Sequence, residues 1–343
     1  MKILFYSPSF YPKLGGIETV ADLLAIGLQN IDNIEITIYT NTLLASHEIE
    51  LNRNYRIIRN SKNLSLIKLA FETTVFVLHG LSLKAIIPVL LFNTKVFVIH
   101  HIPYLNHDLS GNFLQKIKHF FAAYTKNIYV SNYLKNKIGY KGVTILNPYD
   151  ESSFFSNNQR GLNKKVLFAG RLVSDKGVNV LIDAFKDLKE LDLHLDIVGE
   201  GPELEKLIKQ VDKLDLNSKI SFLGAKNRTE LAILMRDYFL LVIPSVWEEP
   251  FGIIALEGLA SGCQIISTGR GGLSEAQGDF GFYYDYQNSK ELAYQIILAS
   301  LKVNDEIDNQ LNFKLSSHHV QQIASQYYNI FRDAKKFTSK FSY

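Results

Sequence analysis

Residues 240–257 read LLVIPSVWEEPFGIIALE and contain the pattern that decides the fold. The run 240–243 is continuously apolar, as in a strand that is buried on both faces. Pro250 and Gly252 predict a turn after this strand, and an apolar helix follows to about Ala260. A buried strand that leads through a turn into a helix is typical of a parallel βαβ unit.

The same alternation extends in both directions along the chain. In the second half it predicts strands at 166–169, 193–198, 220–222, 240–243 and 264–267, with helices at 178–188, 203–214, 229–235 and 252–260. In the first half it predicts strands at 3–6, 34–39, 75–78, 96–99, 128–130 and 143–146. Both halves therefore indicate an α/β fold with doubly wound parallel sheets, in which ligands lie beyond the carboxyl ends of the strands.

The pattern is interrupted around residues 147–163, which we predict to link two domains. Asn147-Pro148-Tyr149-Asp150 is a turn signal, and the stretch 156–161 is polar. A length of 343 residues also fits two domains of roughly 150 residues. We place the domains at 1–150 and 151–320. The stretch 311–336 has a helical pattern, and we predict a C-terminal helix within 321–343 that can return to the first domain.

Composition excludes several classes of protein. The single cysteine, Cys263, rules out a disulfide framework and a cysteine-based zinc cluster. The N-terminus has no secretory pattern, and the longest apolar run, 85–92, is far shorter than the roughly 20 residues that span a bilayer. We therefore expect a cytoplasmic protein. Residues 1–150 carry 15 Lys and Arg against 9 Asp and Glu, whereas residues 151–343 carry 22 against 25. The basic first half suggests an anionic partner.

Two carboxylates flank the start of the helix in the opening stretch. Glu249 precedes it and Glu257 lies within it, eight residues later. Carboxylates accept several hydrogen bonds and suit the vicinal hydroxyls of a sugar or ribose, while free N–H groups at a helix start bind oxygen atoms. Taken alone, the two residues favour a structural interpretation, in which Glu249 complements the helix dipole and Glu257 is a solvated helix residue.

The surrounding motifs resemble family 4 of the retaining glycosyltransferases, which have the GT-B fold. The similarity rests on six motifs in the family's order, and it covers nearly the whole chain. They are Pro12-x2-Gly15-Gly16-x-Glu18, Phe168-Ala169-Gly170-Arg171-Leu172 with Asp175-Lys176-Gly177, Ile197-Val198-Gly199-Glu200-Gly201-Pro202, Ile220-Ser221-Phe222-Leu223-Gly224, Ser245-x3-Glu249-Pro250-Phe251-Gly252 with Glu257, and Gly271-Gly272-Leu273-x-Glu275. The resemblance implies two Rossmann-like domains that face each other across a cleft, the first on the acceptor side and the second for the nucleotide-sugar.

The resemblance also implies a role for each matching residue. Arg171 would stabilise the departing diphosphate through paired hydrogen bonds, and Lys176 would do so through its point charge. Glu249 would hold the hydroxyls of the transferred sugar, and Glu257 those of the ribose. Backbone groups would complete the donor site, at Gly15, Gly16, Gly199, Phe222, Leu223, Gly224, Phe251, Gly252 and Ile253.

A histidine at the end of the strand 96–99 would contact the sugar near its reacting carbon. Two adjacent residues, His100 and His101, fit this place, and strand alternation directs them to opposite faces. The choice between them stays open. His79 ends another strand, and we expect it to be structural.

No metal or cofactor is expected, because the sequence has no Asp-x-Asp pattern and Arg171 with Lys176 can take over the charge stabilisation. The donor would be a nucleotide-diphosphate sugar of the UDP or GDP type. The chain departs from the family at Pro148, Gly258 and Gln264, none of which has a charged role. The first domain is short for the family, which suggests trimmed loops on the acceptor side.

The stretch 113–138 combines basic and aromatic residues, and we expect an interfacial helix on anionic lipid there. A core helix with a solvated basic face fits this composition equally well. Lipid contact would place the protein at the inner face of the membrane.

Together these features predict a retaining glycosyltransferase that acts on a glycan or lipid-linked acceptor, as in cell-envelope polysaccharide or glycolipid synthesis, and not on nucleic acid. The alternatives are a nucleotide-sugar epimerase of the same fold, which needs an acid–base pair at the sugar ring, and an inactive glycan-binding protein. A phosphorylase would need a pyridoxal lysine and a far longer chain. A dinucleotide-dependent oxidoreductase would need Gly-x-Gly-x-x-Gly after the first strand, and Gly15-Gly16 lacks that spacing.

Overall fold

The computed structural model describes residues 1–13, 15–45, 51–60, 63–89, 94–103, 113–156, 164–301 and 309–334. The chain divides into two units, one formed by residues 1–148 with 317–343 and the other by residues 149–316. Parts of three sequence predictions lie outside the described residues, namely 157–163 of the linker, 90–92 of the apolar run and 335–343 of the C-terminal helical segment.

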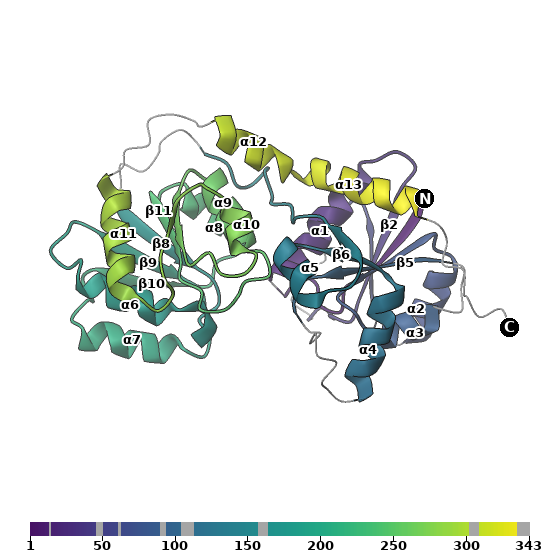
Figure 1. The fold of residues 1–343 in the computed structure, drawn as a ribbon, viewed down its shortest axis with the longest axis horizontal. Helices are drawn as coiled ribbons and strands as arrows, with labels where there is room; N and C mark the ends of the chain where they lie inside the picture. The colour runs from purple at the N-terminus through teal and green to yellow at the C-terminus, as the bar shows by residue number, and fades with distance from the viewer. Residues whose placement is uncertain are drawn as a thin grey trace. The chain divides into compact units, whose positions relative to one another are not determined.

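The first unit is built on a parallel sheet of seven strands in the order β3-β2-β1-β4-β5-β6-β7 (Figure 1). The strands are β1 (Lys2–Tyr6), β2 (Glu35–Thr40), β3 (Arg56–Arg59), β4 (Val75–His79), β5 (Lys95–His100), β6 (Lys126–Tyr129) and β7 (Gly142–Thr144). The helices are α1 (Gly16–Gln29), α2 (Asn63–Phe71), α3 (Leu83–Val89), α4 (Phe113–Tyr124), α5 (Asn132–Ile138) and α13 (Val320–Asp333). Every residue of the central strand β4 is buried, which explains its unbroken apolar run.

The second unit contains a parallel sheet in the order β10-β9-β8-β11-β12-β13. Its strands are β8 (Lys165–Ala169), β9 (His194–Val198), β10 (Ile220–Gly224), β11 (Leu240–Ile243), β12 (Gln264–Ser267) and β13 (Phe282–Tyr283). Its helices are the 3-10 turn η1 (Ser174–Lys176), α6 (Val178–Lys186), α7 (Leu204–Lys213), α8 (Arg228–Met235), α9 (Ile253–Ala260), α10 (Leu273–Gln277), α11 (Ser289–Leu301) and α12 (Asn309–Ser317). Figure 1 shows helices on both faces of the sheet, as the sequence predicts for a doubly wound fold.

The structure differs from the sequence prediction at two edge strands, along two predicted helices, and at α2, α3, α10 and α11, which the sequence analysis did not predict. β3 and β13 escaped notice because an edge strand is short and half exposed, so its sequence carries little apolar signal. The stretch 113–138 is wrong as a single helix, since β6 separates α4 from α5. The predicted helix at 311–336 is also interrupted, because His319 adopts an extended conformation (φ −60°, ψ 146°) before α13 begins.

Helix α13 completes the helical layer of the first unit from the far end of the chain. It packs against α1, and the ring of Phe331 lies 4.7 Å from that of Phe97 on β5. The ammonium group of Lys95 donates to the carbonyl oxygens of Phe331 and Arg332, at 2.9 and 3.1 Å. A cation at the carboxyl end of a helix is stabilised by the helix dipole. The C-terminal helix is therefore an integral part of the first unit's core.

Gly27 of α1 should be essential for this packing. A Cβ there would lie 2.7 Å from Ala324 Cβ and 2.9 Å from Val320 Cγ1 of α13. We expect Gly27→Ala to lower the free energy of unfolding by about 1–3 kcal/mol, because it overpacks the helix pair. Gly16→Ala in the same helix is the control, since a Cβ at Gly16 has no atom within 4 Å. Urea unfolding measures both, and equal effects of the two substitutions would contradict the role of Gly27.

Candidate functional site

The candidate site of the second unit lies where its sheet changes direction, between β8 and β11. The chain winds outward from these neighbouring strands in opposite directions, and ligands of open α/β sheets bind at such a point. The segment after β8 and the segment after β11 are joined there by their backbones. The N–H groups of Val246 and Trp247 donate to the carbonyl oxygen of Asp175, at 2.9 and 3.1 Å. Gly177 has φ +68°, and a Cβ there would overlap the carbonyl oxygen of Pro244.

This contact brings Lys176 against Glu249. The ammonium group of Lys176 donates to Glu249 Oε1, which also accepts from Ser245 Oγ at 2.6 Å. Both charged side chains are mostly buried, with 28% and 12% of their surface exposed. The carbonyl oxygen of Glu249 accepts from the N–H of Gly272 at 2.7 Å, so the loop after β12 fixes the backbone here. Arg171 lies on the segment after β8 and is exposed.

Helix α9 begins directly behind Glu249. Gly252 precedes its first turn with φ +95°, and a Cβ at this position would lie 2.6 Å from Leu273 Cδ1. No side chain caps the helix, and it has no acidic residue in its first turn. The first N–H groups of a helix have no acceptor within it, so those of Ile253 and Ile254 are donors suited to anionic or hydroxyl oxygens, whereas the N–H of Ala255 donates to the carbonyl oxygen of Gly252 at 3.0 Å. Phe251 is buried and anchors the turn.

The glycine-rich ends of β9 and β10 form the other side of the switch point. Gly199 has φ +143°, and a Cβ there would overlap the carbonyl oxygen of Gly170 after β8. Its N–H donates to the carbonyl oxygen of Gly224 at 2.9 Å. Phe222 packs against the core of the unit, and Leu223 beside it is half-buried. Gly199 is thus required for the approach of the three strand ends, whereas a Cβ at Gly224 would meet open space.

Glu257 lies in the buried part of α9 and pairs with a residue that the sequence analysis missed. Its Oε1 is 2.8 Å from Arg228 Nη2, and Arg228 Nε is 3.3 Å from Asp150 Oδ2. Burial raises the pKa of Glu257, and the guanidinium of Arg228 opposes that rise. The only available signal in the sequence was a cation at the first position of a helix, where the dipole disfavours positive charge.

In the first unit, the three strand-end histidines are buried in two separate arrangements. His79 Nδ1 lies 3.1 Å from His101 Nε2, and their rings are stacked. His100 Nε2 instead lies 2.8 Å from Asn127 Oδ1, with its ring on that of Tyr129. Since the amide nitrogen of Asn127 donates to the carbonyl oxygen of Ala122 at 2.7 Å, Oδ1 is the acceptor and His100 donates. The ring of His100 therefore packs against residues of β6, while that of His101 pairs with His79 at the end of β4.

The glycine loop of the first unit leads into α1. Gly15 is exposed and in extended backbone, and a Cβ there would come within 2.5 Å of Glu18 Oε2. Gly16 is exposed with open space around it. The carboxylate of Glu18 therefore lies over the helix start. An anionic ligand at this loop requires that Glu18 turn away.

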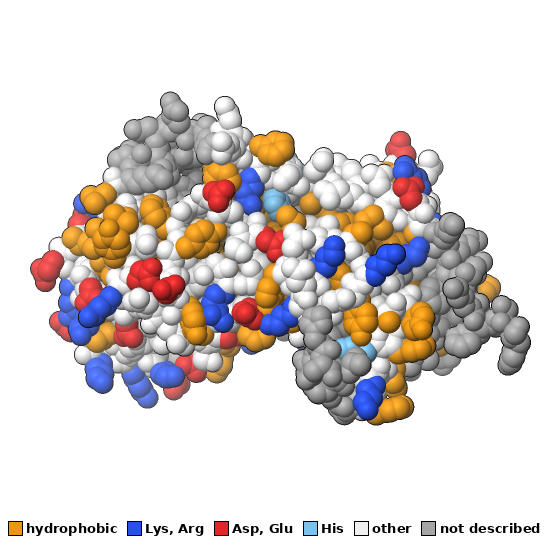
Figure 2. Space-filling view, viewed as in Figure 1, with side chains coloured by type: hydrophobic (Ala, Val, Ile, Leu, Met, Phe, Trp, Pro, Cys, Tyr) orange, Lys and Arg blue, Asp and Glu red, His pale blue; other side chains and the backbone are white. Residues whose placement is uncertain are grey.

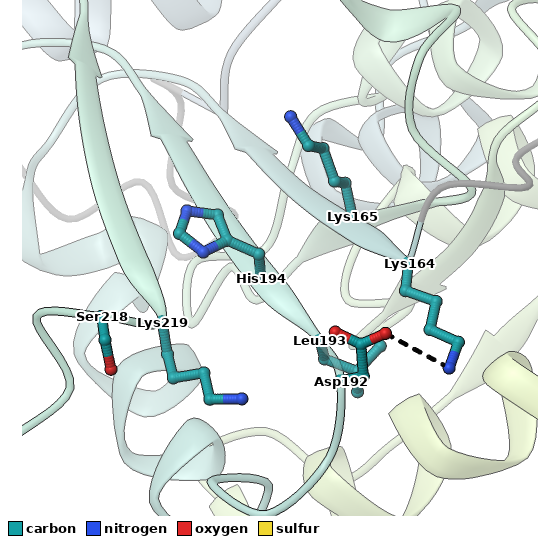
Figure 3. A pocket seen from close by; sticks show the side chains of 7 residues that line it. All are labelled: Lys164, Lys165, Asp192, Leu193, His194, Ser218 and Lys219. Carbon is teal, nitrogen blue, oxygen red and sulfur yellow. Dashed lines mark ion pairs between the residues drawn. The ribbon is translucent and has the colours of Figure 1, made fainter.

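A hollow of about 400 Å³ lies at the opposite, amino-terminal ends of β8, β9 and β10 (Figure 3). Three of its seven lining residues are lysines, of which Lys164 pairs with Asp192 at 3.5 Å and Lys219 donates to the carbonyl oxygen of Leu191 at 2.7 Å. None of the predicted site residues lines it. Elsewhere in the described ranges, no cluster of three or more His, Cys, Asp or Glu side chains is arranged to hold a metal ion. Nor does any helix among the described residues have both the length and the apolarity to cross a membrane.

The buried histidines should make stability depend on pH. Burial lowers the pKa of His79 to about 3 and that of His100 to about 4. Below pH 6.5 the unfolded chain takes up protons that the folded chain does not, so stability falls from there towards pH 4, by up to about 1.4 kcal/mol per pH unit for each group. We expect His100→Gln to reduce the slope of the free energy of unfolding between pH 6.5 and pH 4.5. Urea unfolding at several pH values measures it, with the half-exposed His194→Gln as control. An unchanged slope in His100→Gln would contradict the prediction.

Comparison with known proteins finds sequence similarity over part of the chain. Residues 150–310 match the model of the family described as glycosyl transferases group 1. An uncharacterized glycosyltransferase of Methanocaldococcus jannaschii is 33% identical over 206 residues, which are 57% of this chain and 56% of that protein. A similar relative of Bacillus subtilis is 28% identical over 60% of each chain. The chain thus spans little more than half the length of the curated relatives it matches.

Solved structures extend the similarity of the fold to both units. A glycosyltransferase from Rickettsia africae superposes with a TM-score of 0.81 at 18% identity, over 97% of this chain and 98% of that one. The HepE protein of Anabaena, solved in complex with UDP, has a TM-score of 0.77 at 20% identity, over 97% and 100% of the two chains. The fold is therefore that of the GT-B glycosyltransferases, and residues 150–310 carry the sequence pattern of glycosyl transferases group 1.

Proposed function

We propose that the protein is a metal-independent, retaining glycosyltransferase of family 4 that uses a nucleotide-diphosphate sugar. The observation that carries the proposal is the pair of Lys176 and Glu249 beside the uncapped start of α9, at the switch point of the second sheet. Lys176 supplies a cation that can bind phosphate, and Glu249, in direct contact with it, supplies a carboxylate that can bind sugar hydroxyls. The match of residues 150–310 to glycosyl transferases group 1 supports the same conclusion.

In the proposed reaction, the bond between the anomeric carbon and the donor phosphate breaks, and its electron pair leaves with the nucleoside diphosphate. The acceptor oxygen bonds to the anomeric carbon on the same face, and its proton passes to the departing phosphate. Arg171 and Lys176 stabilise the growing negative charge, with the N–H groups of α9 as further donors. Glu249 orients the transferred sugar through its hydroxyls, and Glu257 holds the ribose.

We assign the histidine of the first unit to His101. His100 is 0% exposed within β5 and its ring is engaged by Asn127 and Tyr129, whereas His101 follows the end of the strand, is 5% exposed and is engaged by His79. Burial and the neighbouring rings of His79 and His100 keep the pKa of His101 well below its usual range. A neutral imidazole donates or accepts one hydrogen bond without adding charge beside the anomeric carbon.

Nucleotide binding tests the proposal directly. We expect UDP, GDP or their sugar conjugates to raise the melting temperature of the protein, with one base preferred. HepE, which is similar in fold, was solved with UDP, so the uridine compounds come first. Arg171→Ala should weaken binding of that nucleotide by about 10- to 100-fold, the value of a charge-assisted hydrogen bond. Isothermal titration calorimetry measures the loss.

The control is Lys165→Ala, which removes an exposed lysine from the opposite ends of the strands and should leave the affinity unchanged. Absence of stabilisation by every nucleotide would refute the donor site. The epimerase alternative is distinguished by product analysis, because a transferase releases nucleoside diphosphate when an acceptor is supplied, whereas an epimerase leaves the nucleotide-sugar bond intact.

We further propose that the acceptor is lipid-linked and is met at an anionic membrane, through the outward face of α4. Phe113, Phe120 and Tyr124 are 75%, 51% and 64% exposed, and their spacing places them on one side of the helix. Lys116 is exposed beside them. Figure 2 shows hydrophobic side chains and a basic one gathered over this helix. This face is aromatic as well as basic, which favours a lipid interface over the merely solvated basic face that the composition also allowed.

Liposome co-sedimentation tests this face. We expect the protein to sediment with vesicles that contain phosphatidylglycerol, less so as salt is raised, because salt screens the attraction of lysine to anionic lipid. The triple variant Phe113→Ser, Phe120→Ser, Tyr124→Ser should remain in the supernatant. Phe313→Ser, which removes a 77% exposed aromatic residue from α12, is the matched control and should sediment like the unaltered protein. Equal recovery of unaltered protein in the supernatant with and without vesicles at low salt would refute membrane contact.

A further inference from the structure

We propose that Arg228 is a positioning residue, which keeps the carboxylate of Glu257 ionised and oriented for the hydroxyls of a bound nucleotide. The inference rests on the proposed function, since it assumes that Glu257 contacts the ligand. Arg228 lies outside every motif that the sequence analysis identified. Its positive charge would allow the buried carboxylate of Glu257 to stay ionised and accept hydrogen bonds from the ligand.

The contact is an ion pair between a buried carboxylate and a guanidinium whose side chain is 28% exposed. Glu257 is 5% exposed, and its Oε1 lies 2.8 Å from Arg228 Nη2. An isolated carboxylate at such depth would take up a proton, because burial disfavours the charged form. Among the described residues, Arg228 is the only cation that acts on the pKa of Glu257, and it lowers the pKa that burial raises.

Arg228 is held from two further directions, so it acts as a fixed support. Its Nε lies 3.3 Å from Asp150 Oδ2, and its guanidinium lies 5.1 Å from the ring centre of Phe154. Asp150 is itself fixed by Ser152 Oγ, which donates to its Oδ1 at 2.6 Å. Two carboxylates and one guanidinium leave the three side chains with a net charge of −1. Such a cluster suits ligand hydroxyls, which donate hydrogen bonds, and repels phosphate.

The remaining surroundings of Glu257 supply little other charge. β11 and β12, which pack against α9, have no ionisable side chains. On α10 the ionisable side chain is Glu275, which is half-buried. The negative charge of Asp150 raises the pKa of Glu257. The pKa of Asp150 itself is lowered, because its hydrogen bonds and the charge of Arg228 outweigh the effect of burial. Loss of Arg228 would therefore leave Glu257 beside a like charge with no counterion.

The experiment compares Arg228→Met with Arg236→Met. Both arginines project from the ends of α8 towards residues 150–155, and Arg236 donates to the carbonyl oxygen of Ser153 at 2.8 Å and stacks on Phe155. Only Arg228 is paired with Glu257. The affinity for UDP and GDP is measured by calorimetry between pH 5.5 and pH 8.5 in each variant.

We expect Arg228→Met to weaken binding at least tenfold at pH 6 and to recover part of this loss as pH rises, because loss of the guanidinium raises the pKa of Glu257 further and so enlarges the protonated fraction at the lower pH. Arg228→Lys should restore binding at pH 6 in part, since it returns the charge without the planar fork. Arg236→Met should match the unaltered protein at every pH. Glu257→Gln combined with Arg228→Met should bind no more weakly than Glu257→Gln alone, because Arg228 acts through Glu257.

Circular dichroism checks that each variant is folded. If Arg228→Met does not fold, the affinity and pH profile of Arg228→Lys are compared with those of the unaltered protein instead. The same affinity and pH profile in Arg228→Met as in the unaltered protein would overturn the role of Arg228. An additive loss in the double variant would also overturn it. If the unaltered protein binds neither UDP nor GDP, the proposed function fails instead.

Discussion

The candidate site of the second unit depends on one backbone contact, in which two N–H groups from the loop after β11 share the carbonyl oxygen of Asp175. This contact is possible only because Gly177 has no Cβ and adopts a left-handed conformation against the carbonyl of Pro244. It sets the positions of residues that are 73 apart in the sequence, Lys176 and Glu249. A loop that was free to move would hold neither charge in place, whereas the carbonyl of Asp175 fixes both sides of the switch point together.

Charge in this unit is separated into two neighbourhoods with different chemistry. Arg171 and Lys176 supply positive charge after β8, where Glu249 neutralises part of it. Glu257, Arg228 and Asp150 form a cluster with a net negative charge around α9. A nucleotide-sugar has the same division, since its diphosphate is anionic and its ribose and hexose present hydroxyl donors. The division also has a cost, because a buried carboxylate is tolerated only with a counterion close by.

The first unit shows how far the chain's order departs from its spatial order. Its helical layer is completed by α13, which follows the entire second unit in the sequence. α13 can pack closely against α1 because Gly27 has no Cβ at the contact. The helical pattern at 311–336 was visible in the sequence, yet its interruption was not. Residues 309–316 belong with the second unit, where Lys314 donates to the carbonyl of Glu275, while α13 contacts α1. Local helix propensity does not encode that the chain passes from the second unit to the first near His319.

The sequence by itself determined the α/β class, the doubly wound sheets and the central strands, because strands buried on both faces need continuous apolar runs such as 75–78 and 240–243. It also singled out Lys176, Glu249 and Glu257 by their motifs, although it gave no contact between any of them. Only the tertiary structure decided that Lys176 meets Glu249, that Arg228 lies between Glu257 and Asp150, and that His100 and His101 have different partners. The physical reason is that side-chain pairing depends on where distant loops cross the carboxyl edge of a sheet, and periodicity carries no information about that crossing.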